Sequence, residues 1–190
     1  MRFSQAISEG DGISLIVDVA DVGAGLAAAA QGAEGVIVYA AVDGLRDAIE
    51  LPILWGGGGR PADASAAGAD AWIVRMRGDD DDGAVLATEH AEAVELGLDC
   101  AVEVRNEEEL ALALERLDPE ILVLSAEDDA GKLQRALELL PDVPAGKLAV
   151  ADVQVSGRDQ VDELERAGVD AVIVGARNVS GLVGDAAPEV

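Results

Sequence analysis

The sequence predicts an α/β fold in which eight βα units close into a minimal (β/α)8 barrel of parallel strands with short loops. The prediction rests first on a repeated phrase: A-G-V-D-A-V-I-V-G at Ala167–Gly175 returns as A-G-A-D-A-W-I-V at Ala67–Val74 and, more loosely, as Q-G-A-E-G-V-I-V at Gln31–Val38. Each copy places a helix-ending glycine before an apolar strand, as a parallel strand covered on both faces requires. The offset of about 100 residues between the first two copies matches four units of about 25 residues, hence eight in all.

Composition and charge limit the classes of protein that fit this sequence. The chain has 190 residues, suited to one domain over 1–190, and its 38 acidic against 13 basic residues give a net charge of -25. Such a field repels nucleic acid and anionic membranes, so neither is expected as a partner. Abundant acids with almost no lysine favour a halophilic, salt-adapted cytoplasm, although an acidic mesophilic surface would have the same composition.

The single cysteine and the apolar runs bear on compartment and cofactors. Cys100 alone excludes an internal disulfide and a cysteine metal cage, and its place in an apolar strand predicts a small buried residue. No signal peptide opens the chain, and no apolar run approaches about 18 residues. We therefore expect a soluble cytoplasmic protein, and neither a metal nor a cofactor.

Eight apolar strands follow from the pattern, each bounded by turn residues or by a helix signal. In order along the chain they are Ser14–Val19, Val36–Ala40, Pro52–Trp55, Ala71–Met76, Cys100–Val104, Ile121–Ser125, Leu148–Ala151 and Ala171–Gly175. Before the first strand, Arg2–Ile7 is a short amphipathic stretch that could plug the bottom of the barrel.

The helices between these strands are recognised by alanine content, caps and helical spacing. Pro61 suits a first helical position, Asn106 a cap with Glu109 three residues on, and Ser156 a start with Asp159 in the first turn. The remaining expected helices are Gly23–Ala30, Leu45–Ile49, Ala84–Leu96, Gly131–Leu140 and a short, weak Val179–Val183.

Ligands of such a barrel meet the C-terminal ends of the strands and the loops that follow them. The polar residues at these ends are Asp18, Tyr39, Arg75, Arg77, Glu103, Arg105, Ser125, Asp152, Arg177 and Asn178. Asp18, Glu103 and Asp152 are the candidate catalytic residues, because each interrupts or ends an apolar strand where an unpaired carboxylate is costly. Converging carboxylates would raise at least one pKa, as a general acid requires. Alternatively, they pair with the arginines and only hold the rim together.

Four other features of the sequence can each be interpreted as a ligand or metal site or as ordinary structure. Gly56–Gly59 is a flexible loop or an anion-binding nest, and Asp79–Asp82 is a solvated loop or a divalent cation site. His90 is structural or exposed on a helix. Trp55 and Tyr39 stack on a ring of a ligand or simply fill the mouth of the barrel.

Several phrases resemble the indole-3-glycerol phosphate synthase family. C-A-V-E-V-R-N-E-E-E-L, from Cys100, resembles its fifth strand, and the phrase ending at Gly175 its eighth. F-S-Q-A-I…I-S-L-I-V-D-V and E-L-P-I-L resemble its approach to the first strand and its third strand. The resemblance implies a phosphate-binding TIM barrel and an activity that closes the indole ring of a carboxyphenylamino-deoxyribulose phosphate, with loss of carbon dioxide and water.

The resemblance carries some site residues over. The fifth-strand glutamate is kept as Glu103, while the glutamates of the first and seventh strands become Asp18 and Asp152. The sixth-strand asparagine becomes Ser125, and the eighth-strand Gly175 is retained. A small-molecule or phosphate ligand at the C-terminal face is therefore the expected partner, with Gly175, Arg177, Asn178 and Ser125 as ligand-binding candidates.

The cations of the family do not carry over. The lysine after the first strand becomes Ala20, the third-strand lysine that serves as principal general acid falls on Gly56, and an arginine after the sixth strand becomes Glu127. The glycine that helps to cradle phosphate falls on Gln154. Three lost charge-assisted contacts amount to roughly 4–9 kcal/mol of binding free energy.

Three functions are compatible with these substitutions. The first is a divergent barrel without the synthase activity and of unknown ligand. The second is a lyase or isomerase that acts on a small sugar-phosphate or cyclic substrate, with Glu103, Asp18 and Asp152 as acid and base. The third is a structural partner that acts through its acidic surface. The oligomeric state is left open.

Overall fold

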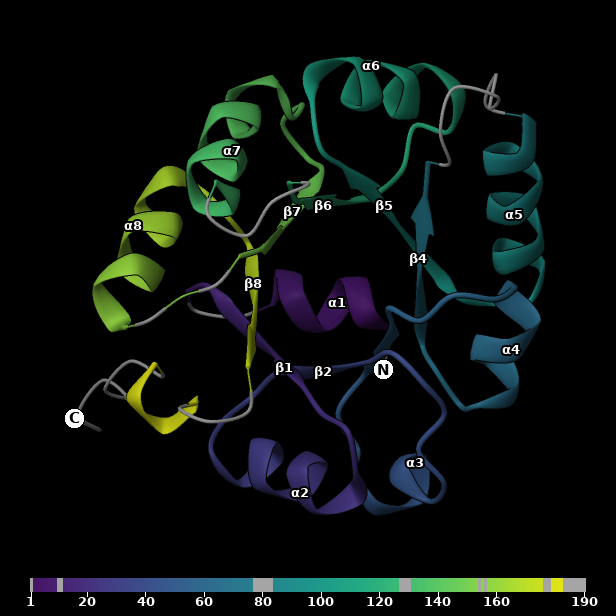
Figure 1. Cartoon of the computed structure of the whole chain (residues 1–190), viewed down its shortest axis with the longest axis vertical. Coiled ribbons are helices and arrows are strands. Elements are labelled where there is room, and N and C mark those ends of the chain that lie inside the picture. Colours follow the sequence, from purple (N-terminus) through teal and green to yellow (C-terminus); the bar gives the residue numbers. More distant parts are fainter. Residues whose placement is uncertain are drawn as a thin grey trace.

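The eight strands close into a barrel, as the sequence predicts. The structure, a computed structural model, describes residues 2–9, 12–76, 84–126, 131–153, 155, 157–175 and 179–182. All neighbouring strands are parallel, and β8 pairs with β1 to close the ring in chain order. Helices surround this ring (Figure 1), so that the strands are covered from outside.

The strands agree with the expected ones, and β8 has the expected bounds. The other seven differ only at their ends, where burial and backbone pairing stop gradually. Their bounds are β1 Ser14–Asp18, β2 Gly35–Val38, β3 Ile53–Trp55, β4 Ala71–Arg75, β5 Asp99–Val104, β6 Ile121–Leu124, β7 Leu148–Asp152 and β8 Ala171–Gly175.

The helices also follow the expected order. Their bounds are α1 Phe3–Ser8, α2 Val22–Ala30, α3 Leu45–Ala48, α4 Pro61–Ala66, α5 Ala84–Glu95, α6 Glu107–Arg116, α7 Lys132–Leu139 and α8 Arg158–Ala167, with short 3-10 turns η1 Leu140–Asp142 and η2 Val179–Gly181. None of the helices among the described residues is long and apolar enough to cross a membrane.

Local chemistry accounts for the helix starts. The Asn106 side chain accepts the Glu109 N–H at 2.9 Å, and Asp21 caps α2 in the same way at 2.8 Å. The start of α8 differs from the expected Ser156: the N-cap is Gly157, and Ser156 itself lies outside the described residues. The expected weak helix at Val179 is only a 3-10 turn.

The acidic residue in each copy of the repeated phrase ties one strand to the strand before it. Its N–H donates to a carbonyl near the start of that strand, and its carboxylate accepts the N–H of the same residue, so both backbone groups are satisfied. The pairs, with the distance from carboxylate oxygen to amide nitrogen, are Glu34 with Leu15 (3.1 Å), Asp70 with Ile53 (2.8 Å) and Asp170 with Ala149 (2.7 Å).

The bottom of the barrel is closed by α1, which crosses the centre of the ring (Figure 1). Phe3 and Ile7 are buried in the cluster of side chains that fills the barrel, so the expected plug is confirmed. Asp99 fixes the plug in place: its carboxylate accepts the Ser4 N–H at 2.9 Å and pairs with the Arg2 guanidinium. The interior is thus a packed core beneath the strand ends.

The plug predicts a large cost for its truncation. Phe3 is fully buried, so Phe3→Ala should lower the free energy of unfolding by about 3–5 kcal/mol, measured by urea denaturation. Leu26→Ala on α2, where the side chain is 50% exposed, is the control and should change it by less than about 0.5 kcal/mol. Equal effects of the two substitutions would contradict the role of α1 as the floor of the barrel.

Candidate functional site

The alternation of side chains along the strands decides which residues reach the upper mouth of the barrel. Every strand contributes to the interior cluster, and its members nearest the upper strand ends are Ile16, Ile37, Leu54, Ile73, Ala101, Val123, Val150 and Ile173. The residue two positions further on each strand points to the same side. We call this set the mouth: Asp18, Tyr39, Gly56, Arg75, Glu103, Ser125, Asp152 and Gly175. All three carboxylates proposed from the sequence are among them.

Glu103 lies against Arg75. The two residues are register partners on β5 and β4, and the Arg75 Nε donates to Glu103 Oε2 at 2.5 Å. The Glu103 side chain is only 16% exposed, so this charge-assisted bond sits in partly desolvated surroundings. For Glu103 the structure therefore contains the arginine pairing that one interpretation of the sequence expected.

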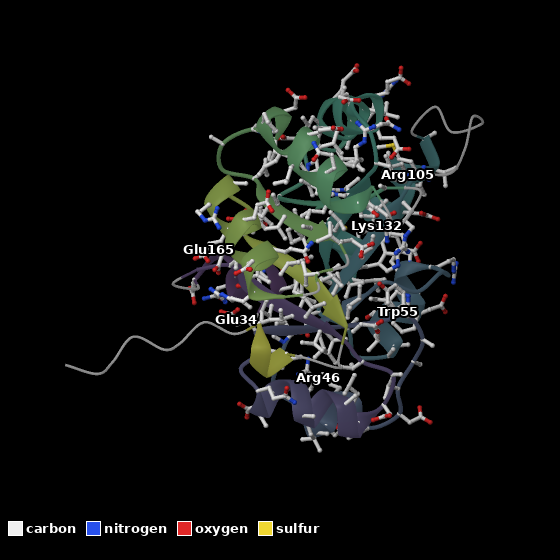
Figure 2. The ribbon with its side chains drawn as sticks, turned by 60° about the vertical axis from the view of Figure 1, so that its left-hand side comes forward. Glu34, Arg46, Trp55, Arg105, Lys132 and Glu165 are labelled. Carbon is white, nitrogen blue, oxygen red and sulfur yellow. The ribbon has the colours of Figure 1, made fainter. Side chains whose placement is uncertain are left out.

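Asp152 receives two donors on a single oxygen. Its Oδ2 lies 3.3 Å from the Ser125 hydroxyl, which donates to it, and 3.5 Å from Lys132 Nζ. Ser125 belongs to the mouth, but Lys132 is the first residue of α7, in the outer helix layer. Figure 2 shows Lys132 on the same side of the barrel as Trp55 and Arg105, away from Glu34 and Glu165.

Lys132 was not among the residues expected from the sequence, although a signal for it was present. The helix expected over Gly131–Leu140 follows the sixth strand, so its first turn lies above the C-terminal ends of the strands. A lysine there has a stem long enough to reach inward. The residues at the strand ends alone do not include this first turn. They therefore contain fewer cations than the rim of the barrel in the structure.

Asp18 lies in the mouth beside Gly175, its register partner on β8. Partial burial raises the pKa of the Asp18 carboxyl, and the negative charge of Asp152 raises it further. A carboxyl whose neighbour is already negative is the one that retains a proton longest as the pH rises. This raised pKa makes Asp18 a candidate proton donor in the mouth.

Tyr39 covers the position where the third strand ends. A side chain at Gly56 would place its Cβ 2.8 Å from Tyr39 Cε1 and from Ile37 Cδ1, and a Cβ at Gly57 would lie 2.4 Å from the Tyr39 carbonyl oxygen. These two glycines are therefore required by the close approach of the chain at the end of β2. The phenol itself is 48% exposed and lies over the mouth.

The remaining aromatic and arginine candidates lie elsewhere. Trp55 is 6% exposed and packs in the outer layer between strands and helices, with its Nε1 donating to the Gly58 carbonyl at 3.3 Å. It therefore does not line the mouth. Arg105 turns to Glu109 on α6, at 2.7 Å, and lines a cavity of about 500 Å³ between α6 and α7. Arg135 in that cavity pairs with Glu107 and Glu138, so both arginines there have carboxylate partners.

Other sequence signals carry no site in the described part of the chain. Burial lowers the pKa of His90 and raises that of the buried Cys100 to about 12, which opposes thiolate formation. No group of three metal-binding side chains occurs among the residues outside the gaps. The remaining positions singled out from the sequence lie outside the described residues: Arg77, Asp79–Asp82, Glu127, Gln154, Arg177 and Asn178.

Comparison with known proteins agrees with the resemblance seen in the sequence. Residues 62–180 match the family model described as indole-3-glycerol phosphate synthase. The chain belongs to this family. Synthases from Nocardioides sp. (strain ATCC BAA-499 / JS614) and Geobacillus sp. (strain WCH70) are 35% and 32% identical over 67% and 45% of this chain, covering 47% and 34% of their own lengths. The chain thus spans less than half the length of these relatives.

Solved structures confirm the TIM barrel. One described as "Native KDPGal structure" matches with a TM-score of 0.66 at 13% identity, covering 96% of this chain and 95% of that chain. A mutant tryptophan synthase alpha-subunit from the hyperthermophile Pyrococcus furiosus matches with a TM-score of 0.65 at 17% identity, covering 87% and 88%. Identity this low shows the fold and nothing finer.

Tyr39 offers a direct measurement of the field in the mouth, because the chain has a single tyrosine. Burial, then the charges of Asp152 and Asp18, raise its pKa to about 12. An ordinary phenol is half ionised near pH 10, whereas Tyr39 should then be about 1% ionised, as read from phenolate absorbance. Protein denatured in guanidinium serves as the reference for an ordinary phenol.

Substitution of one carboxylate should lower this pKa. Asp152→Asn removes a negative charge that disfavours the phenolate, so the Tyr39 pKa should fall toward the ordinary value. Asp118→Asn, at the opposite end of the barrel, is the matched control and should leave it unchanged. Half-ionisation of the folded protein near pH 10 would contradict the described position of the ring.

Proposed function

We propose that this member of the family does not close the indole ring and that its mouth binds a different small molecule. The observation that carries the proposal is the packing of Tyr39 against Gly56. In the resemblance, Gly56 takes the position of the lysine that serves as the family's principal general acid. A lysine side chain starting there would require the Tyr39 ring and the Ile37 side chain to shift, and the proton donor is absent from this position.

The charges of the mouth support the same proposal. The two cations described there, Arg75 and Lys132, already lie against Glu103 and Asp152. A substrate carrying both a phosphate and a carboxylate would have to compete with these carboxylates for each cation. The lysine contributed by α7 restores one of the positive charges that the strands lack, but it starts from a different element and lies against its own carboxylate.

The proposal predicts no synthase turnover. The full chain is assayed with the carboxyphenylamino-deoxyribulose phosphate in about 1 M potassium chloride, which screens the negative surface. The synthase from Geobacillus sp. (strain WCH70), assayed beside it in a buffer that suits that enzyme, is the positive control. We expect less than about a thousandth of the control rate, since proton transfer by a positioned group contributes about 10²–10⁴-fold. Measurable turnover that Glu103→Gln abolishes would overturn the proposal.

A second candidate is a lyase or isomerase that uses the mouth carboxylates as acid and base. It is favoured by their unequal surroundings: the pKa of Asp18 is raised, while Glu103 is held by the Arg75 guanidinium. Groups whose environments differ in this way can take opposite roles in one proton transfer. Small sugar phosphates and cyclic ketones are the substrate classes that match this chemistry.

Proton exchange tests the second candidate without knowledge of the product. In heavy water, an enzyme of this class replaces hydrogen next to the substrate carbonyl with deuterium, which proton NMR detects. If a panel of small ketose phosphates and cyclic ketones contains a substrate, Asp18→Asn and Glu103→Gln should each slow exchange at least about tenfold. The control Asp118→Asn should not slow it. Exchange at an equal rate in all three variants would refute acid–base catalysis by these carboxylates.

A further inference from the structure

The contact between Asp152 and its two donors has the form of a binding site for an anionic oxygen. Ser125 and Lys132 come from different elements, the end of β6 and the start of α7, and both approach the same oxygen, Oδ2. A hydroxyl and an ammonium directed at one point would hold a phosphate or carboxylate oxygen of a ligand equally well. In this structure the point is taken by the protein's own carboxylate.

Both distances show that Asp152 is held loosely. Ser125 Oγ lies 3.3 Å and Lys132 Nζ 3.5 Å from Oδ2, whereas charge-assisted bonds are commonly about 2.7–2.9 Å long. By contrast, Lys147, the other lysine of the chain, lies 2.6 Å from Asp118. Asp152 thus contacts both donors at distances longer than the Lys147–Asp118 pair, and its side chain is 27% exposed.

The position of Lys132 is unfavourable for the helix that carries it. It is the first residue of α7, where the positive end of the helix dipole disfavours a cation. Its side chain is nevertheless only 18% exposed, so it is directed inward rather than into solvent. A lysine in this place contributes to the mouth more than to the stability of α7.

The neighbouring strand ends in a residue without a side chain. Asp152 pairs in register with Ile173, and Gly175, two residues further along β8, has no side chain. A Cβ added at Gly175 would meet no atom of the described residues within 4 Å. A small anion that approaches Asp152 from the side of β8 meets no side chain at Gly175, and the described carboxylate on that side is Asp18, the register partner of Gly175.

We propose that Ser125 and Lys132 form an anion-binding pair in the mouth and that Asp152 is its internal competitor, displaced by a phosphate or carboxylate group of the ligand. The inference rests on the proposed function, in which the mouth binds a small molecule, and it names the chemistry of that ligand. The pair would allow a strongly acidic protein to bind an anion, because Lys132 supplies a positive charge beside the ligand that the negative surface does not.

Removal of the competitor tests the proposal. Binding of inorganic phosphate to the full chain is measured by calorimetry in about 1 M potassium chloride, and acetate is titrated in parallel to separate phosphate from carboxylate recognition. Asp152→Asn should bind phosphate, acetate or both at least about tenfold more tightly than the unmodified protein. Asp152→Ala, which removes the carboxylate without adding an amide donor, should give the same gain.

The two lysines provide a matched control. Asp118→Asn releases Lys147 at the far end of the barrel and should give no gain for either anion, because no second donor converges there among the described side chains. The gain of Asp152→Asn should disappear when Lys132→Gln is added, and Lys132→Arg should retain part of it.

Three results would overturn the proposal: no gain in either Asp152 variant, an equal gain in Asp118→Asn, or a gain that survives Lys132→Gln. Each is read from binding alone, so it is separate from the synthase assay. Turnover in the synthase assay would show that the protein still closes the indole ring. It would not affect the anion-binding result, which is judged from the binding measurements alone.

Discussion

The register in which the eight strands pair is the constraint on which the mouth depends. Alternate residues of a strand face opposite sides, so a slip of one residue on any strand would exchange its interior side chain for one that belongs beneath the helices. Glu34, Asp70 and Asp170 hold three of the strands at their starts, each by binding both backbone groups of one residue. Once these starts are held, Asp18 on β1 and Asp152 on β7 are placed at the same end of the barrel. The repeated sequence therefore forms a strand and, through its acidic residue, also sets the register of that strand with the preceding one.

Two of the three carboxylates of the mouth have a cation beside them, while the molecule as a whole is strongly negative. With a net charge of -25, the electrostatic field of the whole chain repels anions and does not stabilise the carboxylates in the mouth. Instead Arg75 lies against Glu103 and Lys132 against Asp152, while Asp18 has a raised pKa. The ammonium group comes from a helix, α7, and not from a strand.

The sequence predicted the strands, the plug and the three carboxylates at the strand ends, because each follows from a local pattern, but it also placed Arg105 at the rim, whereas that side chain turns to Glu109. Short apolar runs after helix-ending glycines identify strands, and Phe3 and Ile7 lie on one face of a short helix. Alternation could also have placed Trp55 in the outer layer, since Leu54 faces the interior. The contact of Lys132 with Asp152 could not be derived in this way, since it depends on the tilt of α7 and on the rotamers of a long side chain. The same holds for Tyr39 above Gly56, which depends on how closely β2 approaches the chain beyond β3.

The close packing of Tyr39 on the third strand limits the paths by which this sequence can change. A lysine placed at position 56 alone would bring its Cβ to 2.8 Å from the phenol ring and from Ile37 Cδ1, so both side chains would have to shift. A larger residue at position 56 thus calls for a compensating change at position 37 or 39. The contact couples positions at the ends of two neighbouring strands, so substitutions there are expected to have non-additive effects on stability.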